Sequence, residues 1–112
     1  MSKFKSVRVV VDGQRFDSQK EAARGFDLKL MQKAGKISEL RFQVPFVLQE
    51  SFIHDGMKEQ DICYVADATY MENGKFIVED TKSDHTRKND LYRVKRKLLL
   101  FRYPDITFRE YL

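Results

Sequence analysis

The sequence predicts one small domain of the α/β or α+β class, in which helices pack against a mixed β-sheet. Three observations lead to this class. The 112 residues are enough for a single core and one domain. Apolar segments typical of strands are interspersed with two segments of helical periodicity. Two dipeptides, Asp12-Gly13 and Asn73-Gly74, each join a pair of apolar segments and predict tight β-hairpins.

The first elements expected along the chain are a hairpin and a helix. Residues 7–11 and 14–16 flank the Asp-Gly turn and form the hairpin. Ser18 and Glu21 then make the Ser-x-x-Glu pattern that begins helices, and this helix is expected to continue to about Lys33. Its packed stripe is expected to consist of Ala22, Phe26 and Leu30.

The middle of the chain is expected to contribute three strands, at residues 40–48, 61–71 and 75–82. Pro45 has no backbone N–H to donate, so the first of these strands belongs at a sheet edge or a bulge. Residues 49–60 are interpreted as a loop.

The end of the chain predicts a second helix, from about Asp90 to Tyr103, and a last short strand at residues 106–111. Pro104 ends the helix. The apolar residues at helical spacing, which we expect to pack, are Leu91, Val94, Leu98 and Phe101. The order is therefore a hairpin followed by α-β-β-β-α-β. We interpret residues 1–112 as one domain, with the hairpin in 1–16 and the core in 17–112.

Composition limits the function classes. An apolar content of 42% is typical of a globular chain, and the absence of a long apolar segment predicts no membrane span and no membrane partner. The first residues show no secretory signal. The single cysteine cannot form an internal disulfide, which favours a reducing compartment. We therefore expect a cytoplasmic protein.

Charge is unevenly distributed along the chain, although the net charge is only +4. Residues 87–102 carry seven basic side chains and one acid, and a group of acids lies just before them. A basic flank beside an acidic centre fits a site that binds both a phosphate backbone and cations. Two solvated faces that happen to adjoin explain the same pattern.

Three residues on the second predicted hairpin could carry chemistry. Side chains two residues apart share a face of a strand, so Asp80 and Lys82 project together, and the hairpin brings Asp67 near Asp80. Adjacent carboxylates repel unless a cation lies between them, and Mg²⁺ prefers oxygen ligands. A nearby lysine could orient a metal-bound water or offset charge on phosphate. The alternative is a structural Asp67, paired with a lysine or accepting backbone N–H groups.

This pattern resembles the PD-(D/E)xK nuclease superfamily, which has a restriction-endonuclease-like fold with an αβββαβ core. The resemblance rests on residues 16–21, 43–46, 64–67 and 78–82 and covers most of the chain. It is closest to short phage-encoded members resembling Holliday junction resolvases. The resemblance implies that the metal-binding and catalytic acids are Asp67, Asp80 and Glu21, and that the catalytic lysine is Lys82.

The chain departs from the family pattern in two places and leaves one role open. Ala66 stands where the family name has proline, and the acid before the lysine is Asp80 rather than glutamate. Glu79 is a competing candidate, but strand alternation places it on the face opposite Lys82. Glu21 has two readings, a metal ligand or the N3 residue of a capping box with Ser18.

The implied activity is Mg²⁺- or Mn²⁺-dependent hydrolysis of phosphodiester bonds in DNA. Such a small enzyme is expected to recognise the shape of DNA through its phosphates rather than its base sequence. Branched DNA in phage recombination or processing is the expected substrate, in the cytoplasm of a bacterial host. Residues expected to contact nucleic acid are Gln43, Arg87, Lys88, Tyr92, Arg93, Lys95 and Lys97. For Gln43 and the helix residues, a solvated surface is the alternative. For the whole chain, the alternatives are a non-catalytic nucleic-acid-binding module and a protein-interaction factor.

A homodimer is also expected, because resolving a junction needs two cuts related by two-fold symmetry. Residues 7–11 and 46–48 carry apolar side chains that could form its interface. They could equally cover the helices of a monomer.

Overall fold

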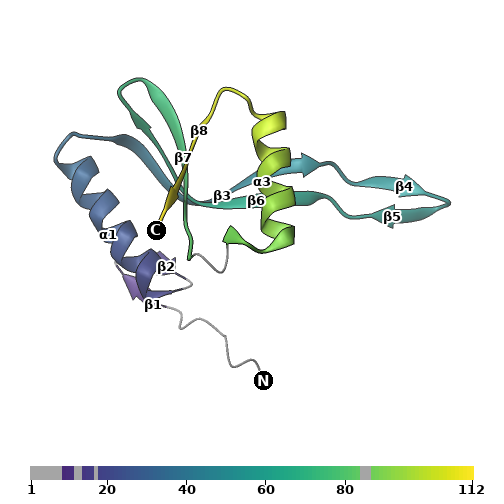
Figure 1. Cartoon of the computed structure of the whole chain (residues 1–112), viewed down its shortest axis with the longest axis horizontal. Coiled ribbons are helices and arrows are strands. Elements are labelled where there is room, and N and C mark those ends of the chain that lie inside the picture. The colour runs from purple at the N-terminus through teal and green to yellow at the C-terminus, as the bar shows by residue number, and fades with distance from the viewer. Residues whose placement is uncertain (1–8, 12–13, 17, 84–86) are drawn as a thin grey trace.

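The computed structural model describes residues 9–11, 14–16, 18–83 and 87–112. Its centre is a four-stranded mixed sheet in the order β3-β6-β7-β8, accompanied by two helices and two small hairpins (Figure 1). The elements are β1 (Val9–Val11), β2 (Gln14–Phe16), α1 (Gln19–Lys33), β3 (Ser38–Gln49), β4 (Phe52–His54), β5 (Met57–Glu59), β6 (Ile62–Glu72), β7 (Lys75–Thr81), α3 (Asp90–Arg102) and β8 (Thr107–Tyr111). The predicted α+β class and the α-β-β-β-α-β order are confirmed.

The helices cover opposite faces of strand β7. Its consecutive residues Ile77 and Val78 point in opposite directions, and each belongs to a different buried cluster. Ile77 packs with Leu28 of α1, whereas Val78 packs with Leu99 of α3. The sheet therefore separates two small cores, one under each helix.

Helix α1 begins where the sequence predicts. The Ser18 side chain is the N-cap and accepts a hydrogen bond from the Glu21 backbone N–H at 3.1 Å. The predicted packed stripe of this helix is only partly correct. Ala22 is buried, but Phe26 and Leu30 are about half exposed, and the other buried positions are Gly25 and Leu28.

The packed face of α1 differs from the predicted one because β2 approaches the helix closely. A side chain at Gly25 would meet the ring of Phe16, since an added Cβ would lie 2.6 Å from it. The face of α1 that carries Ala22 and Gly25 therefore packs toward β2, because only small residues leave room for the Phe16 ring. The residues 12–13 between β1 and β2, where the sequence predicts an Asp-Gly turn, lie outside the described part of the chain.

The three central strands form as predicted. Strands β6 and β7 are joined by Asn73 and Gly74, which have φ angles of 51° and 76°, the backbone that a type I′ hairpin turn requires. Strand β8 pairs with β7 in parallel. Strand β3 lies at one edge of the sheet, which is where Pro45 predicts it.

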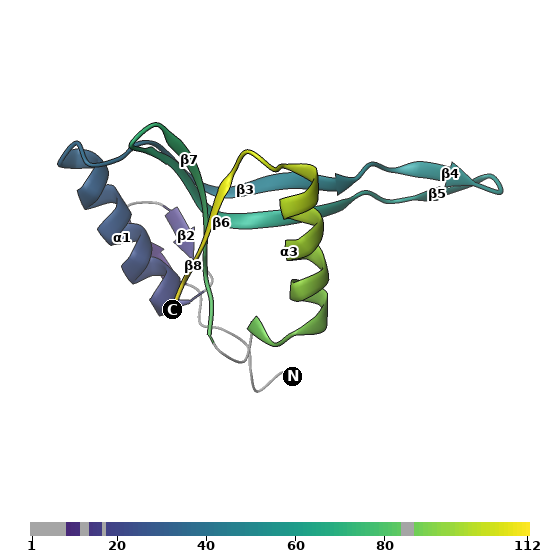
Figure 2. The same ribbon diagram turned by 45° about the horizontal axis from the view of Figure 1, so that its top comes forward.

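Residues 49–60 are not a loop, and this prediction was wrong. Strands β3 and β6 extend past the sheet and continue into the hairpin β4–β5, which projects from the body of the molecule (Figure 2). We call residues 50–61 the arm. Asp55 and Gly56 at its tip have φ angles of 48° and 75°, so this is a second hairpin with two positive φ values at the turn. The radius of gyration, 15.7 Å, exceeds the roughly 13 Å of a compact chain of this length.

Helix α3 packs differently from the prediction. The stripe of Leu91, Val94, Leu98 and Phe101 is 43% to 86% exposed, and only Leu99 is fully buried. The helix instead faces the sheet with Leu99 and Tyr92, while Tyr103 just beyond it packs against Phe46. Tyrosine rings supply much of this core, and a count of aliphatic residues alone does not find them. Phe46 and Leu48 pack in the same core under α3. This agrees with the second of the two readings of residues 46–48, in which they cover a helix of the monomer.

Within the described residues, neither helix is long and apolar enough to cross a membrane.

Candidate active site

The candidate site lies where strands β6 and β7 separate. Their backbone pairing ends at Ala68 and Glu79. Beyond that point, the Asp67 N–H donates to Asp80 Oδ1 at 2.8 Å, and the Thr81 N–H donates to Asp67 Oδ2 at 2.8 Å. Two carboxylates thus replace the main-chain acceptors that a continuing ladder would provide. We call this pair of hydrogen bonds the aspartate brace.

The predicted proximity of Asp67 and Asp80 is therefore confirmed. One part of the structural alternative also holds, because one oxygen of Asp67 accepts a backbone N–H.

Both β3 and β6 change face at this level of the sheet. Ala66 and Ala68 would share a face in a regular strand, yet they belong to the clusters under α3 and α1 respectively. On β3, Gln43 lies between the partners of Ala66 and Ala68, and so stands opposite Asp67. Its φ of 53° is a left-handed conformation that non-glycine residues seldom adopt. Gln43 is half-buried, and its contact with nucleic acid stays a prediction.

Asp80 is the most deeply buried acid of the candidate site, with only 1% of its surface exposed. Burial, together with the smaller effect of the Glu110 charge, raises the pKa of this carboxyl to about 6. The Lys82 charge and the Asp67 N–H act in the opposite direction. Asp80 Oδ2 is buried and has no hydrogen-bond partner among the described residues. An unpaired buried carboxylate oxygen is costly, so this position favours either a proton or a cation.

Asp80 and Lys82 open into one cleft of about 280 Å³ between β6, β7 and the start of α3. Within it, Lys82 Nζ lies 4.9 Å from the centre of the Tyr92 ring, a cation–π distance. Their shared face confirms the prediction from strand alternation. The remaining lining residues are Cys63, Tyr64, Val65, Asn89, Leu91 and Lys95.

Glu79 points to the other face of β7, as alternation predicts. Its carboxylate accepts two hydrogen bonds from Arg24, at 2.7 and 2.9 Å, and one from the Tyr70 hydroxyl at 2.7 Å. This arrangement is a buried ion pair between α1 and the sheet, which leaves Asp80 as the acid beside Lys82.

Glu21 and Asp67 line a second and much smaller cavity, of about 10 Å³, beneath α1. The four expected catalytic residues are thus linked in pairs: Asp67 with Asp80 through the brace, Asp80 with Lys82 in the cleft, and Asp67 with Glu21 in the cavity. They do not surround one point. Within the described ranges, no three His, Cys, Asp or Glu side chains gather closely enough to hold a metal ion.

The N-terminal half of α3 carries a second hollow, of about 250 Å³, next to the cleft. Tyr92 lines both, and its hydroxyl donates to the Glu110 carboxylate. Burial and the Glu110 charge raise the pKa of Tyr92, so this phenol stays protonated and remains a donor. We call this hollow the basic pocket; it is lined by Arg87, Lys88, Tyr92, Arg93, Arg96 and Glu110.

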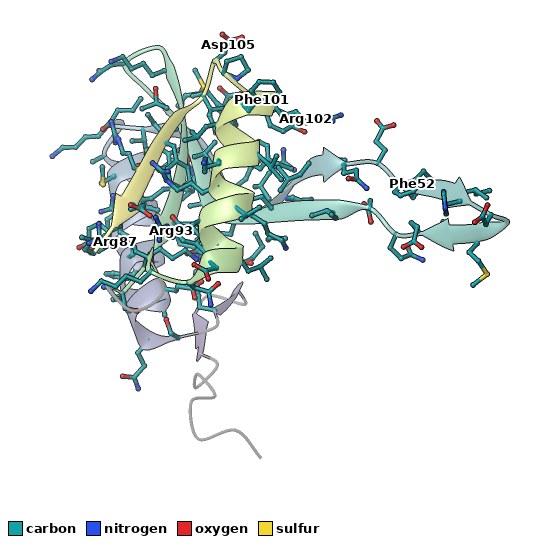
Figure 3. All side chains as sticks on the ribbon, turned by 45° about the vertical axis from the view of Figure 1, so that its right-hand side comes forward. Phe52, Arg87, Arg93, Phe101, Arg102 and Asp105 are labelled. Atoms are coloured by element: carbon teal, nitrogen blue, oxygen red, sulfur yellow. The ribbon has the colours of Figure 1, made fainter. Side chains whose placement is uncertain are left out.

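Most residues expected to bind nucleic acid lie around these two hollows. Lys95 lines the cleft, whereas Lys97 is exposed and lines neither. Arg87 and Arg93 lie on the side of α3 away from the arm (Figure 3). The sequence analysis missed Glu110, which the parallel pairing of β7 and β8 places opposite Asp80. No local motif marks Glu110, because this neighbour relation depends on the register of two strands that are distant in sequence.

The site is thus an acidic pair with a lysine in the adjoining cleft, built on a mixed sheet beside a basic helix. The chain belongs to the family described as "Protein of unknown function (DUF1064)", whose model matches residues 1–110. No curated protein and no solved structure gives a significant match.

Proposed function

We propose that this protein is a metal-dependent DNA endonuclease of the PD-(D/E)xK type. The observation that carries the proposal is the buried, unpartnered Oδ2 of Asp80, in the same cleft as Lys82 and hydrogen-bonded through Oδ1 to the backbone of Asp67. A buried acid with a raised pKa, lying beside a lysine in a cleft and with one oxygen that makes no hydrogen bond among the described residues, is a typical feature of a functional site.

The donor set fits a hard divalent cation. Asp67 and Asp80 would hold Mg²⁺ or Mn²⁺, whereas Glu21, which lines the separate small cavity with Asp67, would have to move to add a third oxygen. Such an ion, when bound, supplies Lewis-acid activation of a phosphate and of an attacking water. The raised pKa of Asp80 is consistent with this role, because a nearby cation would favour its charged form.

The chain's own residues position and stabilise charge. The Asp67 N–H fixes one oxygen of Asp80, so the second oxygen has a defined place. The Tyr92 ring holds the Lys82 ammonium in the cleft, where it can orient water or offset negative charge on phosphate. The Glu110 hydrogen bond fixes that ring in turn.

The basic pocket supports DNA as the substrate. Four cationic side chains line this pocket, and the pocket adjoins the cleft because Tyr92 lines both. Arginine and lysine at such a place bind phosphates without reading base sequence. We propose branched DNA as the substrate and a homodimer as the active form, since two symmetric cuts need two sites.

A non-catalytic nucleic-acid-binding module is the second candidate. The aspartate brace favours it, because the brace gives both aspartates a structural role that needs no metal.

Cleavage assays separate the two candidates. The wild-type protein is incubated with linear, flap and four-way-junction DNA in Mg²⁺, in Mn²⁺ and in EDTA. Lys82→Ala should reduce the cleavage rate on saturating DNA by about a hundredfold or more while changing DNA affinity little. Lys36→Ala, an exposed lysine beyond the end of α1, is the matched control. DNA binding without metal-dependent cleavage of any substrate would establish the binding module instead.

A further inference from the structure

Two apolar surfaces of the molecule have no covering element in the described structure. The first is the outer stripe of α3, formed by Val94, Leu98 and Phe101 and by Leu91, which also lines the cleft. The second is the arm, where Phe52 and Met57 on one face of the hairpin and Ile53 on the other are 47% to 73% exposed. Apolar side chains concentrated in this way are typical of protein interaction sites rather than of a free surface.

The arm also lacks support for its own fold. It consists of two three-residue strands that pair only with each other, and every residue from 50 to 61 is exposed. An isolated two-stranded hairpin is at best marginally stable in water. Its two free edges can pair with or dock on another chain. A partner that covers the arm would therefore stabilise it.

Charge identifies the kind of partner. The arm has four acids, Glu50, Asp55, Glu59 and Asp61, against one Lys58, which gives 1 − 4 = −3 with His54 neutral. DNA would repel such an arm. Helix α3 has five basic residues and one acid over 90–102, which gives 5 − 1 = +4. The arm and α3 therefore complement each other in charge, and each also exposes apolar side chains.

The arm cannot reach α3 of its own chain. Strands β3 and β6 run directly into it and carry it away from the body (Figures 1 and 2). Helix α3 is fixed near the root of the arm, where Arg102 donates to the Leu48 carbonyl and the Tyr103 hydroxyl donates to the Val47 carbonyl. A second copy of the chain offers the same helix in an accessible position.

We propose that the arm of one molecule docks on the outer stripe of α3 of a second copy, and that a two-fold axis makes the exchange reciprocal. This names the surface of the dimer put forward above, and it rests on that dimer but not on nuclease activity. The basic pocket stays free for DNA, because Arg87 and Arg93 lie on the other side of α3 (Figure 3). An isologous contact of this kind closes at two copies.

The test is the mass in solution, measured by light scattering at micromolar concentration without DNA. The wild type should have twice the 13.3 kDa of one chain. The arm variant Ile53→Ser/Met57→Ser and the helix variant Val94→Ser/Phe101→Ser should each weaken dimerisation roughly tenfold or more. All four positions are more than half exposed, so the fold of each monomer should be unchanged by circular dichroism. Phe26→Ser/Leu30→Ser, two half-exposed residues of α1, is the matched control and should remain dimeric.

Mixing the two variants identifies which surfaces meet. A mixture has one intact arm and one intact helix stripe that can face each other, so it should recover part of the dimer. A monomeric wild type, a dimeric arm variant, a dimeric helix variant, or a mixture that stays monomeric would each overturn the proposal. The mass is measured without substrate, so an inactive but dimeric protein would refute the nuclease and leave this surface standing.

Discussion

Replacing Asp80 with asparagine should alter the pH dependence of stability in a way that the structure specifies. The carboxyl has a pKa of about 6 in the folded chain, against an ordinary value of 3.8 when it is exposed to water. The folded state therefore binds this proton more tightly than the unfolded state. Stability supplied by the group is fully present below about pH 4 and is lost as the pH rises to 6 and beyond. The difference corresponds to about 3 kcal/mol.

Asparagine keeps the acceptor for the Asp67 N–H and does not titrate. It also places an amide NH₂ where Asp80 Oδ2 is buried, at a cost of about 1–3 kcal/mol if the amide finds no acceptor. That cost is the same at every pH. We compare the free energy of unfolding of Asp80→Asn with that of the wild type. The variant's value minus the wild type's should therefore increase by about 3 kcal/mol as the pH rises, mostly between pH 4 and 7.

The measurement is urea unfolding followed by circular dichroism at several pH values, in EDTA. Subtracting the variant from the wild type cancels the other titrating groups. A second series in Mg²⁺ gives an independent readout, since the ion should stabilise the wild type at pH 8 but not the variant. A difference between the two proteins that stays constant from pH 4 to pH 8 would refute the reasoning about Asp80.

Three further predictions concern stability, and thermal unfolding checks each of them. Arg24→Met leaves the buried Glu79 carboxylate without its cation and should lower the free energy of unfolding by about 3–5 kcal/mol. Adding Glu79→Gln should recover part of this loss. An unchanged melting temperature for the single variant would contradict the ion pair. Ser18→Ala removes the N-cap of α1 and should cost about 1 kcal/mol, whereas a neutral result would mean that the cap is dispensable. Gly25→Ala places a Cβ against the Phe16 ring and should cost about 1–3 kcal/mol, and a stabilised variant would show that the ring moves freely.

Local signals in the sequence were sufficient for most of the secondary structure. The Asn73-Gly74 turn, the Ser18 cap and the Pro45 edge position all act over a few residues, and the structure has each of them. The strand pair carrying Asp67 and Asp80 followed from the same turn, and alternation was enough to separate Asp80 from Glu79.

Packing directions could not be predicted from periodicity. The stripe of α3 that includes Val94 and Phe101 has the spacing of a packed face, yet it is exposed, because the sheet receives Leu99 and tyrosine rings instead. The arm was missed although Asp55-Gly56 at its tip is a turn dipeptide like Asp12-Gly13, because its strands are only three residues long and show no regular apolar–polar alternation. Glu110 was missed because its position beside Asp80 follows from parallel pairing across 30 residues of chain.

The aspartate brace also predicts which residues of the candidate site are retained for stability alone. Asp67 and Asp80 join β6 to β7 at the point where the backbone ladder ends, so selection for a folded chain alone would preserve both. Among the described residues, the Lys82 side chain makes no comparable link between strands; it contacts the Tyr92 ring at the cleft. If the chain is the nuclease proposed above, a lineage that has lost cleavage should therefore change position 82 before position 67 or 80. Retained aspartates would then indicate a conserved fold, and a retained lysine would indicate the proposed chemistry.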